Sequence, residues 1–189
     1  MHIGLYFGSF NPIHHGHLII ASYCCHKTDL EQVWLILSPL NPLKPSASLL
    51  NEYDRLHLVN LAIENDLKLQ ARDVEFRLPK PSYTVHTLAY LQEKYPDHTF
   101  SIIMGADSLS NLPQWKNSET IINNHHLYVF RRPGFALENP TNAHYTLVEA
   151  PLLDISSTQI RNFIKEGIPV RYMIPDKVAE EIERNNYYR

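Results

Sequence analysis

Three histidines and two glycines lie close together near the start of the chain, at residues 8–17. An apolar run at residues 3–7 precedes this stretch, and another at residues 18–21 follows it. Where a buried strand turns into a helix, unpaired backbone N–H groups point to one place, and the helix dipole favours an anion there. His14 and His17 would direct two imidazoles at that anion. The spacing therefore predicts a phosphate site.

Two small features of the same stretch support this interpretation. Gly8 would let the backbone approach a ligand closely, because it has no side chain. Pro12 would stiffen the turn. The alternative interpretation is a histidine-rich loop without a ligand, or an accidental metal site.

A second group of polar residues stands at the start of a predicted helix, at residues 156–166. Three hydroxyl residues, Ser156, Ser157 and Thr158, can cap this helix or donate to phosphate oxygens beside its exposed N–H groups. Arg161 follows Ser157 by one helical turn, so its guanidinium can hold phosphate oxygens from the same end. An ordinary, well-capped helix is the alternative.

Both stretches resemble signature elements of the nucleotidyltransferase superfamily. The first matches in the pattern Gly8-x-Phe10-x-Pro12-x-His14-x-Gly16-His17, and the second in Ile-Ser-Ser-Thr-x-Ile-Arg at residues 155–161. The stretches at residues 82–88, 105–109, 115–116 and 41–44 resemble bacterial nicotinate-mononucleotide adenylyltransferases. The resemblance runs from Gly4 to about Arg161. It departs at Leu43-Lys44-Pro45, where that family more often has Pro-His-Lys.

The resemblance implies a reaction in which ATP and nicotinate mononucleotide give nicotinate adenine dinucleotide and pyrophosphate. Such a transfer depends on alignment and charge neutralisation more than on a covalent intermediate. His14 and His17 would contact the ATP phosphates, and Lys44 and Arg161 would offset charge on the attacking and leaving phosphates. Mg²⁺ would be held through phosphates and water, with no direct protein ligand.

Selectivity for the acceptor is expected in the middle of the chain. Trp115 offers a flat face for a pyridine ring, although a core tryptophan is the alternative. Tyr83 and Thr84 begin a predicted helix whose N–H groups could receive the nicotinate carboxylate, or Thr84 could simply cap it. The full set expected to bind the acceptor is Ser9, Phe10, Lys44, Tyr83, Thr84 and Trp115.

The residues expected to bind ATP come from both ends of the chain and from its middle. Asp107 could hold a ribose hydroxyl, as acidic residues do in dinucleotide folds, or could merely cap a helix. Arg132 could lie at the adenine or phosphate end, or be solvated. The full set is Gly8, Ser9, Phe10, His14, His17, Gly105, Asp107, Arg132, Ser156, Ser157, Thr158 and Arg161.

These residues must be positioned by alternating strands and helices. Apolar runs predict strands at residues 3–7, 32–38, 99–104, 127–130 and 145–149, and shorter ones at 67–70 and 73–76. Helical spacing follows from residue 18, at 52–65, around 85–91, at 156–166 and at 175–187. The alternation predicts an α/β, doubly wound, mainly parallel, Rossmann-like nucleotidyltransferase fold, whose ligands bind beyond the carboxyl ends of the strands.

Composition narrows the class of protein further. The 189 residues carry 17 Lys+Arg and 20 Asp+Glu, a net charge of −3, which does not favour nucleic-acid or membrane-surface binding. No signal peptide or membrane span is expected. Cys24 and Cys25 are adjacent, which suits a reducing cytoplasm. We expect one domain at 1–189 with the C-terminal helices, about 156–189, packed on it. The oligomeric state stays open, with a homodimer among the options.

Four rival functions stay open. Phosphopantetheine adenylyltransferases commonly have Thr in place of His14, and nicotinamide mononucleotide differs from the expected acceptor by one carboxylate. Class I tRNA synthetases share a His-x-Gly-His element but pair it with a Lys-Met-Ser-Lys-Ser loop, which this chain lacks. A non-catalytic nucleotide-binding protein is the fourth. Pyrophosphate release with ATP and each acceptor would separate these alternatives.

Overall fold

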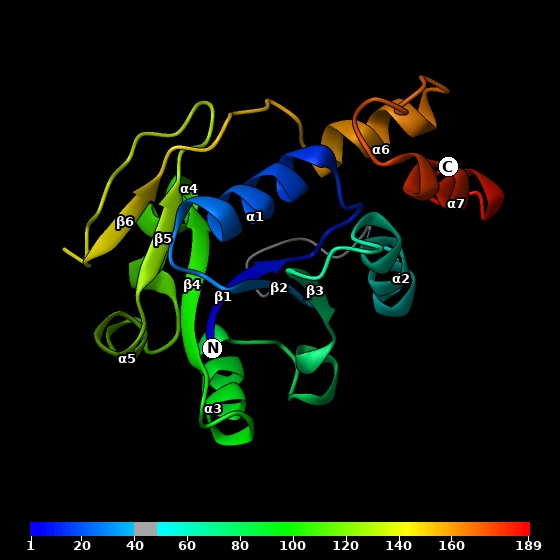
Figure 1. The fold of residues 1–189 in the computed structure, drawn as a ribbon. Coiled ribbons are helices and arrows are strands. Elements are labelled where there is room, and N and C mark those ends of the chain that lie inside the picture. Colours follow the sequence, from blue (N-terminus) through cyan, green and yellow to red (C-terminus); the bar gives the residue numbers. More distant parts are fainter. Residues whose placement is uncertain (40–48) are drawn as a thin grey trace.

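A parallel β-sheet forms the centre of the protein (Figure 1). The computed structural model describes residues 1–39 and 49–189, and within these ranges the sheet has six strands in the order β3-β2-β1-β4-β5-β6. All five neighbouring pairs are parallel. The expected doubly wound parallel fold is confirmed. The strands are β1 (His2–Gly8), β2 (Gln32–Leu37), β3 (Leu69–Arg72), β4 (Thr99–Gly105), β5 (Leu127–Phe130) and β6 (Tyr145–Val148).

Helices cover both faces of the sheet (Figure 1). One core cluster joins the sheet to α1, α2, α6 and α7, and the other joins it to α3, α4 and α5. The helices are α1 (His15–Lys27), α2 (Glu52–Ala62), α3 (Thr84–Lys94), α4 (Ala106–Ser110), α5 (Ser118–Asn124), α6 (Ser157–Lys165) and α7 (Asp176–Arg184), with 3-10 helices η1 (Val74–Arg77) and η2 (Leu112–Gln114).

Alternation along the strands explains why the apolar runs are continuous. In β2, Val33 and Leu35 enter the first cluster, whereas Trp34 and Ile36 enter the second. Successive side chains of a strand point to opposite faces, and both faces here are covered by helices. A sheet buried on both sides therefore requires apolar residues at nearly every position.

The strand order changes direction at β1, which pairs with β2 on one side and β4 on the other. Gly8 lies opposite Leu37, and Tyr6 lies opposite Ile103, so the ends of three strands meet at one edge of the sheet. Ligands of doubly wound folds bind at such a switch point. The loop after β1 is therefore well placed to bind a ligand.

Two expectations about secondary structure need correction. The stretch at residues 73–76 is not a strand: residues 74–77 form η1, in which the Phe76 amide donates to the Asp73 carbonyl (3.0 Å). The strand expected at 67–70 is β3, at 69–72, because Leu67 is 86% exposed and only the later residues pair with β2. The local content of apolar residues did not distinguish a helical turn from a strand at residues 67–77.

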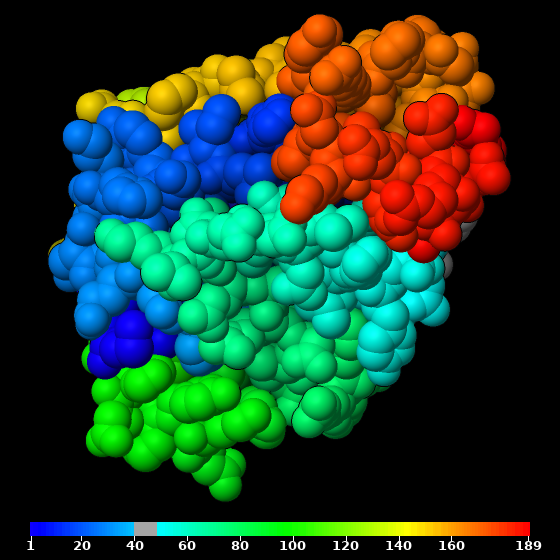
Figure 2. Space-filling model, turned by 45° about the vertical axis from the view of Figure 1, so that its right-hand side comes forward, coloured from blue at the N-terminus to red at the C-terminus, as the bar shows by residue number. Residues whose placement is uncertain are grey.

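The C-terminal helices pack on the same face of the sheet as α1 and α2. Ile160 of α6 and Ile182 of α7 belong to one core cluster with Ile20 and Leu58. Figure 2 shows the red α7 segment lying directly against the cyan α2. Over residues 1–39 and 49–189, no helix is long and apolar enough to cross a membrane.

Candidate active site

The loop between β1 and α1 turns sharply over its own phenylalanine. Phe10 has a positive φ of 44° and a side chain that is only 1% exposed. Its ring lies beneath Gly8, where an added Cβ would come within 2.8 Å of the ring. The packing of the Phe10 ring therefore requires a glycine at position 8. The ring of Phe10 packs in the core, and its contact with ATP or the acceptor stays a prediction.

His14 and His17 form a stacked pair at the start of α1. Their ring centroids are 3.7 Å apart, with an angle of 26° between the planes. The His14 backbone N–H donates to Nδ1 of His17 (3.3 Å). In a neutral His17 the ring proton is therefore assigned to Nε2. Phe10 meets the His17 ring edge-on at 5.1 Å and so helps to fix its orientation.

His14 is a buried, uncharged imidazole. It is 5% exposed, and its Nδ1 has no hydrogen-bond partner within the part of the chain that the structure describes. Burial lowers the pKa of His14 to about 4, and the positive charges of Arg132 and His15 act in the same direction. A Cβ on Gly16 would lie 3.0 Å from this Nδ1. A neutral imidazole with an unused buried nitrogen suits a ligand that supplies the missing partner.

The start of α6 lies directly against the loop after β1. Arg161 donates from one terminal nitrogen to the Asn11 carbonyl (2.8 Å) and from the other to Thr158 Oγ1 (3.3 Å). Ser157 donates to the Pro12 carbonyl (2.9 Å). Ser156 is the N-cap and accepts from a backbone amide within α6. The fold thus brings the two motifs together across about 150 residues of sequence.

Asp107 and Arg132 form an ion pair between α4 and the segment after β5. Arg132 donates to Oδ2 of Asp107 at 2.7 Å. A Cβ on Gly105 would come within 2.5 Å of Asp107 Oδ1 and 2.8 Å of Arg132 Cδ, so this pair requires glycine at the end of β4. The positive charge of Arg132 also lowers the pKa of His14, after the larger effect of burial.

Of the residues expected to bind the acceptor, Tyr83 and Thr84 lie at the start of α3, whereas Ser9 and Phe10 lie in the loop after β1. Lys116 Nζ lies 4.6 Å from the centroid of the Tyr83 ring, which joins α3 to the segment that carries Trp115. Trp115 is half-buried and packs against the second core cluster, and its stacking on a pyridine ring stays a prediction. Thr84 is the first residue of α3, and Tyr83 makes no side-chain cap. Lys44 lies outside the described residues.

Arg55 is an important residue that the motifs did not indicate. It is 0% exposed, and its guanidinium donates to four carbonyl groups, those of Ser9 (2.6 Å), Ser38 (3.0 Å), Pro39 (3.3 Å) and Leu50 (2.9 Å). It therefore holds the loop after β1 against the end of β2. Its spacing from Leu58 and Val59 places it on the buried side of α2, and that spacing was the signal available in the sequence.

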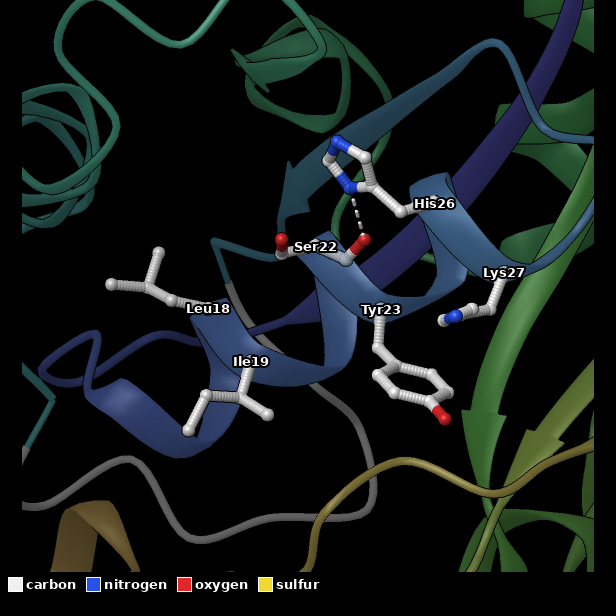
Figure 3. Close-up of a pocket in the computed structure, with 6 residues that line it drawn as sticks. All are labelled: Leu18, Ile19, Ser22, Tyr23, His26 and Lys27. Carbon is white, nitrogen blue, oxygen red and sulfur yellow. Dashed lines mark hydrogen bonds between the residues drawn. The ribbon is translucent and has the colours of Figure 1, made fainter.

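Two other surface features do not form part of this site. A shallow hollow on α1 is lined by Leu18, Ile19, Ser22, Tyr23, His26 and Lys27 (Figure 3). The ring of His26 donates to the Ser22 carbonyl at 2.8 Å, so its polar group is already used. Neither the stacked histidines nor the start of α6 contributes to the hollow.

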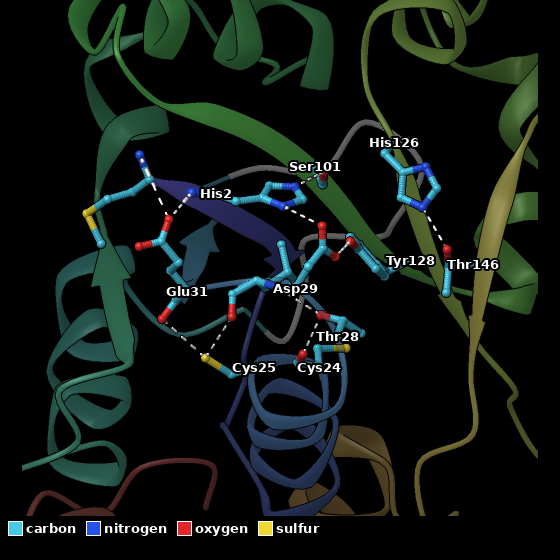
Figure 4. A network of polar contacts seen from close by, with 12 residues as sticks. His2, Cys24, Cys25, Thr28, Asp29, Glu31, Ser101, His126, Tyr128 and Thr146 are labelled. Atoms are coloured by element: carbon cyan, nitrogen blue, oxygen red, sulfur yellow. Dashed lines mark hydrogen bonds and ion pairs between the residues drawn. The ribbon is translucent and has the colours of Figure 1, made fainter.

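The second feature is a polar network at the opposite ends of the strands (Figure 4). His2 contacts Ser101 Oγ (2.7 Å) with one ring nitrogen and Asp29 (3.1 Å) with the other, and the Tyr128 hydroxyl also donates to Asp29. The order Ser-His-Asp is that of a nucleophilic triad, but Ser101 is 1% exposed and no substrate can reach it. The network joins β1, β4 and β5 and is structural.

Comparison with known proteins agrees with this geometry. A family model described as cytidylyltransferase-like matches residues 5–163. A probable nicotinate-nucleotide adenylyltransferase of Flavobacterium johnsoniae is 48% identical, and the match covers all of both chains. The chain belongs to the nicotinate-nucleotide adenylyltransferase family. A member from Bacillus licheniformis is 35% identical over 98% of this chain and 97% of its own.

Solved structures of similar proteins share the fold. A nicotinic acid mononucleotide adenylyltransferase of Plasmodium falciparum, complexed with NaAD, has a TM-score of 0.83 at 21% identity, covering 99% of this chain and 97% of its own. A putative nicotinate-nucleotide adenylyltransferase of Vibrio parahaemolyticus has a TM-score of 0.74 at 22% identity, covering 100% and 95%. The family resemblance drawn from the two motifs is confirmed, and the chain is a nucleotidyltransferase.

Proposed function

We propose that this chain transfers the adenylyl group of ATP to nicotinate mononucleotide and releases pyrophosphate. The observation that carries the proposal is the stacked pair of buried His14 and half-buried His17 at the switch point of the sheet, against the start of α6. The whole-length similarity to probable nicotinate-nucleotide adenylyltransferases supports the choice of substrates. The product is nicotinate adenine dinucleotide, and the cytoplasm is the setting we propose.

The chemistry is an in-line displacement at the α-phosphorus of ATP. A phosphate oxygen of the acceptor forms the new P–O bond, the bond to the bridging oxygen breaks, and pyrophosphate leaves with the electron pair. The two imidazoles donate hydrogen bonds to the α-phosphate region, where charge develops. Because the low pKa of His14 keeps it neutral at pH 7, it acts as an orienting donor and contributes no positive charge.

The start of α6 is suited to the leaving phosphates. The hydroxyl of Ser157 donates to the Pro12 carbonyl, and the guanidinium of Arg161 donates to the Asn11 carbonyl. Phosphate oxygens are stronger acceptors than carbonyls, so these donors would turn to the β- and γ-phosphates when ATP binds. Lys44, outside the described residues, remains proposed as a further positive charge.

Mg²⁺ remains part of the proposal and would enter with ATP. Among the described residues, no group of three or more His, Cys, Asp or Glu side chains could hold a metal ion. Mg²⁺ commonly keeps its waters and binds mainly through substrate phosphates, so we propose that the phosphates of ATP would hold it. Its chemistry would be to neutralise charge on the pyrophosphate.

The start of α3 is suited to the carboxylate of nicotinate. Backbone donors and a positive dipole end favour an anion over the neutral amide of nicotinamide mononucleotide. Each charge-assisted hydrogen bond contributes about 1.5–3 kcal/mol, against about 1 kcal/mol for a neutral one. Two such bonds give a preference of roughly tenfold to a thousandfold.

Pyrophosphate release with ATP and a panel of acceptors tests the proposal. We expect kcat/KM for nicotinate mononucleotide to exceed that for nicotinamide mononucleotide by at least about tenfold, with no turnover of phosphopantetheine. Trp115→Ala should weaken both pyridine nucleotides, because stacking does not distinguish the carboxylate. Equal kcat/KM for the two would contradict the role of α3. ATP binding without pyrophosphate release with any acceptor would favour the non-catalytic alternative.

A further inference from the structure

A buried carboxyl group lies behind the proposed acceptor site. Glu75, on η1, is 1% exposed. Across residues 1–39 and 49–189, no Lys, Arg or His side chain pairs with it. Its Oε1 instead accepts a 2.9 Å hydrogen bond from the hydroxyl of Thr87, which is itself 0% exposed. Burying an acidic group without a cation costs free energy of folding, so the presence of Glu75 at this position calls for a reason.

Two serine hydroxyls complete the surroundings of this carboxyl group. Those of Ser38 and Ser82 are close enough to lower the pKa of Glu75, although burial is the larger effect and raises it. Oε2 of Glu75 and Oγ of Ser82 are both buried, and within the described parts of the chain neither has a partner in good hydrogen-bonding geometry. Glu75 therefore lies between the end of β2 and the beginning of α3.

The residues around Glu75 flank the first turn of α3 on both sides. Ser82 precedes Tyr83 and Thr84, and Thr87 follows them by one turn. The amides of His86 and Thr87 donate to the Tyr83 carbonyl (2.9 and 3.3 Å), and no side chain caps the helix at Tyr83. A hydrogen bond that holds Thr87 therefore also holds the first turn of α3 and the direction of its remaining N–H groups.

We propose that Glu75 is a positioning residue for the acceptor. Through its hydrogen bond with Thr87 it aims the first-turn N–H groups of α3 at the carboxylate of the pyridine ring, and so it sets the preference for a carboxylate over an amide. The inference rests on the proposed function. It adds a residue that touches no substrate and acts through the start of one helix.

The test compares steady-state kinetics of Glu75→Ala and Glu75→Gln with those of the unaltered chain. Glutamine has nearly the same shape, can still accept from Thr87, and can donate to a serine hydroxyl. Thr87→Val removes the hydroxyl with little change in volume and repeats the test from the other side of the contact. Glu93→Ala is the matched control, because Glu93 is an exposed carboxylate on α3, the helix that carries Thr87.

In Glu75→Ala and Thr87→Val we expect the KM for nicotinate mononucleotide to rise at least about tenfold. The preference over nicotinamide mononucleotide should fall at least about threefold, while the KM for ATP changes less than about twofold. Glu75→Gln should restore the KM to within about threefold, and Glu93→Ala should behave like the unaltered chain. The melting temperature is measured for each variant.

Three results would overturn the inference. These are an unchanged acceptor KM in Thr87→Val, an equal rise in the KM for ATP and for the acceptor, or a fall in melting temperature with no change in acceptor preference. In each of these three results the unaltered chain still releases pyrophosphate, so the result differs from failure of the proposed function. That failure would appear as no pyrophosphate release from the unaltered chain with nicotinate mononucleotide.

Discussion

The hydroxyl of Tyr188 donates a 2.9 Å hydrogen bond to Oδ1 of Asn11, which lies 177 residues earlier in the sequence. Asn11 is 4% exposed, and the same Oδ1 also accepts from the Leu50 amide (3.1 Å). The Asn11 carbonyl accepts from Arg161. Three distant segments therefore hold one residue of the loop after β1, between the end of the strand and the stacked histidines.

Removing this hydroxyl should disturb the nucleotide site more than the fold. Tyr188→Phe loses one partly buried hydrogen bond, about 1 kcal/mol or a few degrees in melting temperature. Because Asn11 belongs to the proposed phosphate loop, we expect kcat/KM for ATP to fall about three- to tenfold. Tyr172→Phe is the control, since Tyr172 is 88% exposed. An unchanged kcat/KM for ATP in Tyr188→Phe would show that this hydroxyl does not support the nucleotide site.

The stacked histidines should matter for the rate and not for the fold. His17→Ala, and similarly His14→Ala, should lower kcat about 100- to 1000-fold at saturating ATP, because their donors act where charge develops. His26→Ala on the exposed side of α1 serves as the control. A near-normal kcat in either active-site variant would remove the proposed catalytic centre.

The low pKa of His14 predicts how stability depends on pH. His14 has a pKa of 6.5 in the unfolded chain and of about 4 in the folded chain, so it is protonated at a higher pH when unfolded. Neutral His14 therefore contributes fully to the free energy of unfolding above pH 6.5, and this contribution is lost as the pH falls towards 4. Between pH 7.5 and 4.5 the free energy of unfolding should fall by roughly 2.5 kcal/mol more than in His14→Asn. Denaturant unfolding measures this, and parallel curves for the two proteins would refute it.

Arg161 should affect ATP more than the acceptor. Its guanidinium lies at the start of α6, on the side assigned to the leaving phosphates, and bonds to the Asn11 carbonyl. In Arg161→Ala we expect the KM for ATP to rise at least about tenfold, since charge-assisted bonds to phosphate are lost. Arg171→Ala is the control, because its side chain is 68% exposed. A variant whose single defect is a raised acceptor KM would contradict this placement.

Local pattern was enough to predict the sheet and both motifs. Strands buried on two faces need continuous apolar runs, and such runs mark β1, β2, β4 and β5 in the sequence. The family followed from glycine, proline and histidine spacing, and the relatives confirm it. The short helix α5 was not predicted, and α4 was foreseen only through the alternative that Asp107 caps a helix, because a few residues show no helical period.

The partners of the buried polar groups were decided by the tertiary structure. A sequence pattern can place Arg55 on the inner side of a helix, but its four carbonyl acceptors belong to three segments that meet only after folding. The same holds for Glu75 with Thr87 and for Tyr188 with Asn11. Backbone carbonyls carry no sequence signal, and a hydrogen bond depends on ångström-scale geometry. The sequence by itself therefore determined the chemistry at the switch point, whereas the fold decided which residues hold that chemistry in place.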